Sequence, residues 1–301
     1  MSFPIDYEHA QPLSFGGALP EVRTFDDAAA VILPVPLDRT TSYMPGTRYG
    51  PREILLASAQ VELWDEELGV DVHHHGMVTL PEMELPYATM EAGMAHIQRV
   101  TGEILDRRKF LVTLGGEHSI TSPIVSAAAA RHAGLTVLQI DAHADLRDQY
   151  QGQQHSHACA MRRTLDFAPL VQVGIRNISA EEAAVVPSLE TTIFHDWNMR
   201  DDPAWIARAV SALSDTVYIT IDLDGLDPAT MPAVGTPEPG GLSWRELMAL
   251  LRRTFETRTV VACDVVELCP IPGVVAPNFL AARLVYKLLT YKLGLTRTRA
   301  A

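Results

Sequence analysis

The chain has 301 residues, of which 47% are hydrophobic and 20% charged, an ordinary globular composition. Its net charge of −13 argues against a nucleic-acid-binding protein and is compatible with a cationic substrate. Cys159, Cys263 and Cys269 form neither a disulfide framework nor a CxxC zinc pair. The first residues show no signal-peptide pattern, and no apolar run approaches the ~18 residues that span a bilayer. We therefore expect a cytoplasmic protein that binds neither nucleic acid nor membrane.

Residues 1–28 are irregular and rich in proline and glycine, which predicts an N-terminal arm over the domain or a neighbouring subunit. Beyond them, apolar runs alternate with helical patterns. The predicted strands are, in chain order, 30–35, 110–114, 135–140, 170–174, 191–194, 216–221 and 259–265. The predicted helices are 51–63, 88–109, 121–133, 158–165, 180–187, 203–213, 243–255 and 276–292, and 296–301 is expected to be a flexible tail.

This alternation of near-continuously apolar strands with helices predicts an α/β fold, in which helices cover both faces of a mainly parallel sheet. The chain has no composition break and no Gly/Ser linker, so residues 1–301 are expected to form a single domain. In such sheets, ligands bind beyond the carboxyl ends of the strands.

Acidic and histidine side chains follow three of the predicted strands. The strand 110–114 is followed by Gly115-Gly116-Glu117-His118 and the strand 135–140 by Asp141-Ala142-His143-Ala144-Asp145. The strand 216–221 is followed by Asp222-Leu223-Asp224. Because strand side chains alternate between faces, the acidic and histidine positions within each of the last two clusters can point the same way. The three clusters together predict a metal site at the carboxyl edge of the sheet.

The candidate ligands are two imidazoles and four carboxylates, a set that suits Mn²⁺ or another hard divalent ion better than a structural zinc. Without metal, four carboxylates at one place would repel one another strongly. Six ligands suffice for two ions, which together can lower the pKa of a shared water. The implied chemistry is metal-assisted hydrolysis. From spacing alone, Glu117 could be a ligand in place of His118. The triplet His73-His74-His75 more simply predicts a solvated loop edge, because three consecutive residues cannot all face one ion.

With these clusters in this order, the chain resembles the ureohydrolases, the family of arginase and agmatinase. Further segments of the same resemblance are 45–51, 156–163, 240–244 and 264–267, so that it covers about residues 30–290, and the block 141–163 looks most like the agmatinase branch. The resemblance implies the three-layer α/β/α arginase-deacetylase fold. It also implies a homo-oligomer, trimeric or hexameric.

The resemblance further implies two Mn²⁺ ions per subunit and selects His118 over Glu117. The implied ligands are His118 and Asp145 for one ion, His143 and Asp224 for the other, and Asp141 and Asp222 as bridges. Glu267 would receive the guanidinium group of the substrate, because a carboxylate can accept two parallel hydrogen bonds from that planar fork. His157 would give a proton to the departing amine, although His155 lies two residues away and could do the same. Both roles make Glu267 and His157 catalytic and substrate-binding residues.

The expected reaction is cleavage of agmatine to urea and putrescine, by attack of a metal-bridging hydroxide on the guanidinium carbon. Arginases carry Asn and Ser residues after the Asp-x-His-x-Asp motif, and the loop 146–154 departs from that pattern. Arg147 could instead meet the carboxylate of guanidinobutyrate or guanidinopropionate, so these substrates, and arginine, stay as alternatives. A zinc deacetylase on the same fold would need only one ion. His118, Asp145 and Asp224 would supply ligands for a second ion, which argues against that alternative. A non-catalytic metal-binding regulatory protein would be expected to lack Glu267 or His157.

Overall fold

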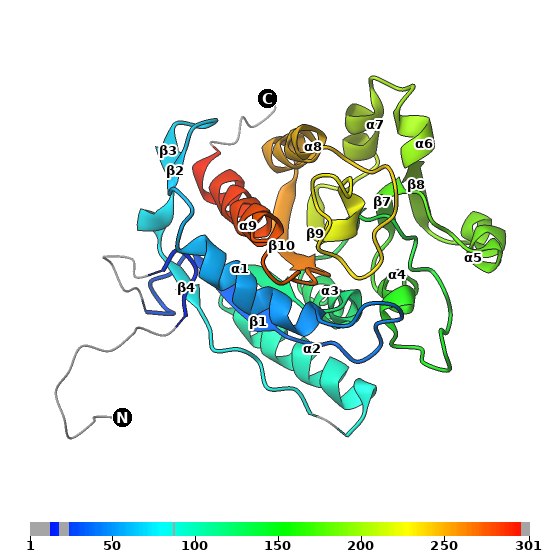
Figure 1. The fold of residues 1–301 in the computed structure, drawn as a ribbon, viewed down its shortest axis with the longest axis horizontal. Coiled ribbons are helices and arrows are strands. Elements are labelled where there is room, and N and C mark those ends of the chain that lie inside the picture. The colour runs from blue at the N-terminus through cyan, green and yellow to red at the C-terminus, as the bar shows by residue number, and fades with distance from the viewer. Residues whose placement is uncertain (1–12, 18–23, 87, 296–301) are drawn as a thin grey trace.

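The computed structural model describes residues 13–17, 24–86 and 88–295 (Figure 1). Most of the predicted N-terminal arm and all of the predicted tail 296–301 therefore lie outside the described residues. The described part of the arm packs on the domain. Phe15 is buried, and its backbone N–H donates to the Thr79 hydroxyl at 2.9 Å, while the Gly16 N–H donates to the Ser58 hydroxyl at 3.0 Å.

The core of the fold is an eight-stranded sheet in which every neighbouring pair is parallel. In spatial order its strands are β4 (Met77–Thr79), β1 (Ala30–Val35), β5 (Phe110–Gly115), β10 (Thr259–Val266), β9 (Thr216–Asp222), β6 (Thr136–Ile140), β7 (Leu170–Ile175) and β8 (Thr191–His195). Two short strands, β2 (Trp64–Asp65) and β3 (Val70–Asp71), form a separate antiparallel pair.

Helices cover both faces of this sheet, which makes three layers. One face packs against α1 (Gly50–Ser58), α7 (Trp205–Ser211), α8 (Trp244–Thr257) and α9 (Ala276–Gly294). The other packs against α2 (Met90–Asp106), α3 (Thr121–Ala129) and α4 (Ala160–Thr164). In Figure 1, α8 and α9 lie on one side of the central strands and α2 on the other. The short helices α5 (Ala180–Val185) and α6 (Asp196–Met199) flank β8 in the sequence.

Strand alternation explains why both faces are apolar. In β1, Val31, Leu33 and Val35 join the core under α2 and α3, whereas Ala30 and Ile32 join the core under α1 and α9. A strand buried on both faces reads as a continuous apolar run, and such runs were the basis for predicting a parallel sheet. The α/β fold class and all seven predicted strands are confirmed. Within the described residues, no helix is long and apolar enough to cross a membrane.

Several boundaries differ from prediction. The helix predicted for 51–63 ends at Ser58, whose hydroxyl donates to the Leu55 carbonyl at 2.7 Å, and a turn follows. The helix predicted for 121–133 ends at Ala129. Strands β2, β3 and β4 and helix α6 were not predicted, because two to four residues are too few to show a period.

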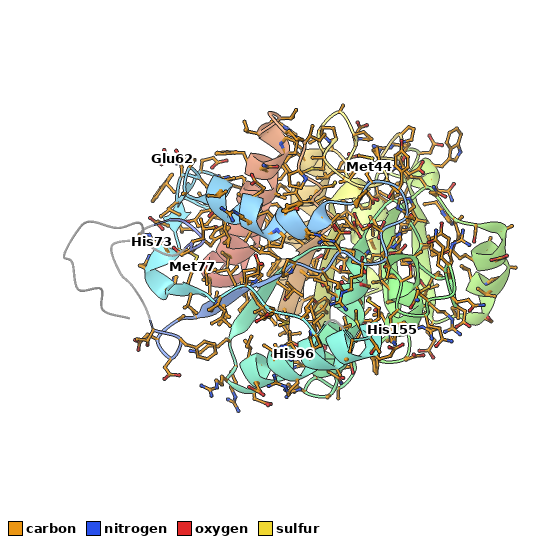
Figure 2. All side chains as sticks on the ribbon, turned by 60° about the horizontal axis from the view of Figure 1, so that its bottom comes forward. Met44, Glu62, His73, Met77, His96 and His155 are labelled. Atoms are coloured by element: carbon orange, nitrogen blue, oxygen red, sulfur yellow. The ribbon has the colours of Figure 1, made fainter. Side chains whose placement is uncertain are left out.

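The triplet His73–His75 forms a short 3-10 turn. The His73 imidazole pairs with Asp71 at 2.6 Å, and His74 and His75 are exposed. Figure 2 shows His73 and His155 far apart along the long axis of the molecule. The prediction of a solvated edge is confirmed.

Candidate metal centre and active site

Four adjacent strands at the middle of the sheet lead to the six predicted metal ligands and to Glu267, whereas His157 lies in a 3-10 turn (His157–Cys159) further along the chain. In spatial order, β5 leads to His118, β10 to Glu267, β9 to Asp222 and Asp224, and β6 to Asp141, His143 and Asp145. In the sequence, β6 is the next strand after β5, but in the sheet β10 and β9 lie between them. This change of strand order at the carboxyl edge is where α/β sheets bind ligands.

The turn after β5 sends Glu117 and His118 in different directions. It needs glycine at position 116, because a side-chain Cβ there would come within 1.8 Å of the Leu37 carbonyl oxygen. The Glu117 carboxylate accepts hydrogen bonds from the backbone N–H groups of Arg39 and Thr40 at 2.7 and 2.6 Å. The His118 imidazole is buried among the aspartates instead. The structure thus brings His118, and not Glu117, to the acidic cluster.

The Nδ1 atom of His118 is surrounded by carboxylate oxygens. It lies 3.1 Å from Asp141, 3.1 Å from Asp145 and 3.4 Å from Asp222, yet it is buried and makes no hydrogen bond. Its Nε2 atom contacts the Thr220 hydroxyl at 2.8 Å. Convergence of carboxylates on an imidazole nitrogen without a hydrogen bond is the arrangement expected where a cation binds between them.

A buried carboxylate fixes the orientation of this imidazole. Thr220 donates its hydroxyl hydrogen to Asp264 at 2.6 Å, so its oxygen must accept from His118 Nε2–H. That tautomer leaves the lone pair of His118 on Nδ1, which faces the aspartates. Asp264 also accepts from the hydroxyls of Tyr218 and Thr121, at 2.5 and 2.9 Å. Partners of this kind orient metal-binding histidines in proteins.

A second group of possible ligands lies beside the first and shares Asp141 with it. His143 Nδ1 lies 3.0 Å from Asp224 and 3.7 Å from Asp141. The ligand atoms of His118, Asp141 and Asp145 all lie within 4.8 Å of one another, and so do those of Asp141, His143 and Asp224. Two such triads with a common carboxylate give this edge of the sheet a histidine and aspartate cluster able to bind metal.

The side chains of the cluster perturb one another's protonation. Burial, followed by the charges of Asp224 and Asp141, holds the pKa of Asp222 well above its usual range. Burial and the charge of Asp141 raise the pKa of Asp145. For His143, burial disfavours the charged ring, but Asp224 and Asp141 outweigh it and raise the pKa to about 12. Protons on these groups offset the crowded negative charge, a task that a divalent cation performs equally well.

Glu267, at the end of β10, shares a cavity of about 220 Å³ with the cluster. The cavity is also lined by His143, Asp145, His157, Asp222 and Asp224. One carboxylate oxygen of Glu267 accepts from the His118 backbone N–H at 2.7 Å. Burial and the charge of Glu117 hold the pKa of Glu267 well above its usual range. A cationic ligand in the cavity would favour the ionised form of this carboxylate.

Of the two candidate proton carriers, His157 lies in the cavity wall. His155 is not among the cavity-lining residues and lies near Glu91, at the start of α2. Cys159 is buried, and burial, assisted by the charge of Asp145, raises the pKa of its thiol to about 11. This pKa argues against a thiolate nucleophile at neutral pH.

Sequence reasoning missed the residues that orient the site. Asp264 and Thr220 lie within apolar runs that form buried strands. A polar residue inside such a run was the only sign in the sequence that either residue has a special role. Gln139 in β6 gave the same signal, and its side-chain N–H donates to Asp141 at 2.6 Å. Glu238, which lies 3.9 Å from His143 and lines the cavity, sits in a loop with no distinguishing pattern.

A parallel α/β/α sheet with a histidine and aspartate cluster at its carboxyl edge defines a class of metal-dependent hydrolases. The Arginase family model matches residues 28–290, and the chain belongs to that family. The chain is 42% identical over 278 residues to an N(1)-aminopropylagmatine ureohydrolase of Synechocystis, covering 90% of this chain and 91% of the relative. It is 30% identical to an agmatinase of Bacillus cereus, covering 82% and 86% respectively. Among solved structures, the agmatine ureohydrolase of Thermoplasma volcanium superimposes with a TM-score of 0.83 at 32% identity, over 90% of this chain and 92% of the other.

Proposed function

We propose that this chain is a ureohydrolase that hydrolyses the guanidino group of agmatine, releasing urea and putrescine. The observation that carries the proposal is that Glu267 and His157 line the same cavity as members of the histidine and aspartate cluster. Membership of the Arginase family and relatives named agmatinase support the same reaction. The alternative of a non-catalytic metal-binding protein is less well supported, because such a protein has no need of this cavity.

We infer that the cluster holds two Mn²⁺ ions. His118 and Asp145 would bind the first ion, His143 and Asp224 the second, and Asp141 and Asp222 would lie between them. The membership of Asp141 in both triads and the buried, unbonded Nδ1 of His118 support this assignment. When bound, a pair of such ions lowers the pKa of a water molecule toward 7 and so supplies a nucleophile.

The protein's own residues would bind and protonate the substrate. Glu267 keeps one oxygen and a lone pair of the other for the guanidinium N–H groups, since the His118 N–H occupies only one acceptor position. Held there, the guanidinium carbon would face the aspartates and histidine that line the same cavity. His157, in the wall of the same cavity, would donate a proton to the amine nitrogen as the C–N bond breaks.

A second candidate substrate is N(1)-aminopropylagmatine, because relatives with 42% and 37% identity carry that name. This substrate extends agmatine by an aminopropyl group with a further cationic nitrogen. Glu238 is half-buried in the cavity wall and offers a carboxylate to such a nitrogen. Arg147, also in the wall, pairs with Glu181 and Glu182 at 3.6 and 3.8 Å, so its charge is already partly offset.

Urea release tests the proposal. Protein incubated with Mn²⁺ is offered agmatine, N(1)-aminopropylagmatine, arginine and 4-guanidinobutyrate in parallel, with Asp141→Asn protein as the blank. Turnover concentrated on agmatine supports the proposed substrate, and preference for the aminopropyl compound supports the second candidate. Preference for 4-guanidinobutyrate would assign Arg147 to a substrate carboxylate. Urea from none of them, in protein shown to contain two Mn²⁺, overturns the proposal. The homo-oligomer implied by the family resemblance stays a prediction that sedimentation equilibrium decides.

A further inference from the structure

A short relay of hydrogen-bonding groups links the Glu117 carboxylate, through the Thr40 hydroxyl, to Nδ1 of His157. The Thr40 hydroxyl lies 2.8 Å from the Glu117 carboxylate and 3.3 Å from His157 Nδ1. The same hydroxyl oxygen accepts from the His157 backbone N–H at 3.0 Å. Neither Glu117 nor Thr40 lines the cavity, and Glu117 is fully buried. The relay therefore lies outside this cavity, and its hydrogen bonds reach the cavity through His157.

The hydrogen of Thr40 is committed to Glu117. A hydroxyl has one hydrogen and two lone pairs. The carboxylate is the closer of the two acceptors by half an ångström, and bonds to an ionised acceptor are the stronger ones. Thr40 must then use its lone pairs toward His157, one for the backbone N–H and one for Nδ1. Contact with Nδ1 is favourable only if Nδ1 carries the hydrogen.

The Nε2 atom of the His157 ring remains available for proton transfer. His157 Nε2 lies 3.3 Å from the Ser42 hydroxyl, and Ser42 lines the cavity together with His157. With the hydrogen on Nδ1, the lone pair of the neutral ring is on Nε2, where a proton can be taken up and given to a leaving group. The Ser156 hydroxyl, 3.3 Å from Nδ1, can turn to accept as well and does not oppose this tautomer.

We propose that Glu117 and Thr40 are positioning residues that hold neutral His157 in the Nδ1–H tautomer, with Nε2 toward the cavity. This inference rests on the proposed proton-donor role of His157. It assigns a task to Glu117, which spacing alone could not distinguish from a metal ligand. All four acceptor contacts of its carboxylate go to Arg39 N–H, Thr40 N–H and the hydroxyls of Thr40 and Ser119, which fixes the carboxylate in place.

Exchange of Glu117 for glutamine should reverse the relay. The amide oxygen would have to remain with the N–H groups of Arg39 and Thr40, which need an acceptor. The amide NH₂ would then face the Thr40 hydroxyl and donate to it. Thr40 could now donate its own hydrogen to His157 Nδ1, which favours the Nε2–H tautomer. Glu117→Gln therefore predicts a change in a directly observable proton position.

The test is long-range ¹H–¹⁵N NMR of the histidine rings in full-length protein, with diamagnetic Mg²⁺ added so that signals are not broadened. The His157 signals are assigned by their loss in His157→Gln. We expect Nδ1–H in the unchanged protein and in Thr40→Ser, and Nε2–H in Glu117→Gln and Thr40→Val. Thr41→Val, in the same loop but bonded to Asp38, should keep Nδ1–H. An Nε2–H ring in the unchanged protein, or no change in Glu117→Gln and Thr40→Val, overturns the inference.

Kinetics on the Mn²⁺-loaded variants give a second readout. Thr40→Val should lower kcat about ten- to a hundredfold, at or below the lower limit of what general acid catalysis contributes because His157 itself is retained, and leave KM within about twofold. Thr40→Ser should restore kcat. Full activity of His157→Gln would refute the proton-donor role while leaving the tautomer result standing, so the two failures are distinguishable. Equal losses in Thr40→Val and Thr40→Ser would mean a packing role and overturn the relay.

Discussion

Two of the proposed site residues occupy a backbone conformation that is costly for a side chain. Glu267 has a φ of 67° and Asp145 a φ of 53°, in the left-handed region. A non-glycine residue in such a region costs about 1–3 kcal/mol and persists where surrounding contacts fix it. For Glu267 these contacts are its own N–H bond to the Gly116 carbonyl and the His118 N–H on its carboxylate. The conformation turns the carboxylate from the strand end into the cavity.

Glu267→Gln tests whether that carboxylate receives the guanidinium. The amide keeps the size and the bond to His118 but removes the charge. Loss of one partner of a buried ion pair costs about 3–5 kcal/mol, so kcat/KM should fall at least about a hundredfold. Steady-state urea release measures this, and Mn²⁺ content should be unchanged. The exposed Glu181→Gln is the control. Near-normal kcat/KM in Glu267→Gln would contradict the assignment.

The two triads predict unequal effects of single aspartate changes on metal content. Asp141 belongs to both triads and Asp224 to one. After dialysis against limiting Mn²⁺, we expect two ions per subunit in the unchanged protein, one in Asp224→Asn and fewer than one in Asp141→Asn. Elemental analysis by mass spectrometry measures the ratio of metal to protein. Equal metal content in the two variants would mean that Asp141 is not shared.

At the scale of elements, the site depends on where strands end and on which strands are neighbours. The ends were predictable, because each acidic cluster directly follows an apolar run. The neighbours were not, because no local pattern encodes the insertion of β10 and β9 between β5 and β6. That insertion brings Asp264 to Thr220 and His118. The relay through Thr40 escaped prediction for the same reason, since residues 77 positions apart meet only in the fold.

Helices α8 and α9 are joined to the segment between β2 and β3 through Glu67. Its carboxylate accepts from Lys287 at 2.5 Å, from Tyr291 at 2.7 Å and from Arg252 at 2.7 Å. Burial opposes the charge of Glu67, but these hydrogen bonds outweigh it and lower the pKa from 4.5 to about 2. The unfolded chain therefore binds more protons between these values, and stability is lost as the pH falls through that window.

Glu67→Gln should flatten this acid dependence. Above pH 5 we expect a loss of about 1–2 kcal/mol, less than the full shift implies because the carboxylate is about a third exposed. Between pH 4.5 and 2, the difference from the unchanged protein should shrink toward zero. Urea unfolding across this range measures it, with the exposed Glu103→Gln as control. A constant difference at all pH values would show that the ionised carboxylate is not the source.

At the scale of the whole molecule, the central strands hold a cluster whose charges repel one another, so folding and metal binding should be linked. The described site gathers four aspartates at one sheet edge, and the pKa of Asp222 and of Asp145 is raised there.

A cation that binds the folded state and not the unfolded one stabilises it by about 2.7 kcal/mol at a hundred times its Kd. For a chain of this size we expect Mn²⁺ at that excess to raise Tm by about 4 °C. Differential scanning calorimetry with Mn²⁺ or with a chelator measures the shift. Asp141→Asn removes the carboxylate common to both triads, so this variant should gain little Tm from Mn²⁺. A Mn²⁺-induced shift of the same size in Asp141→Asn would place the stabilising ion elsewhere in the molecule.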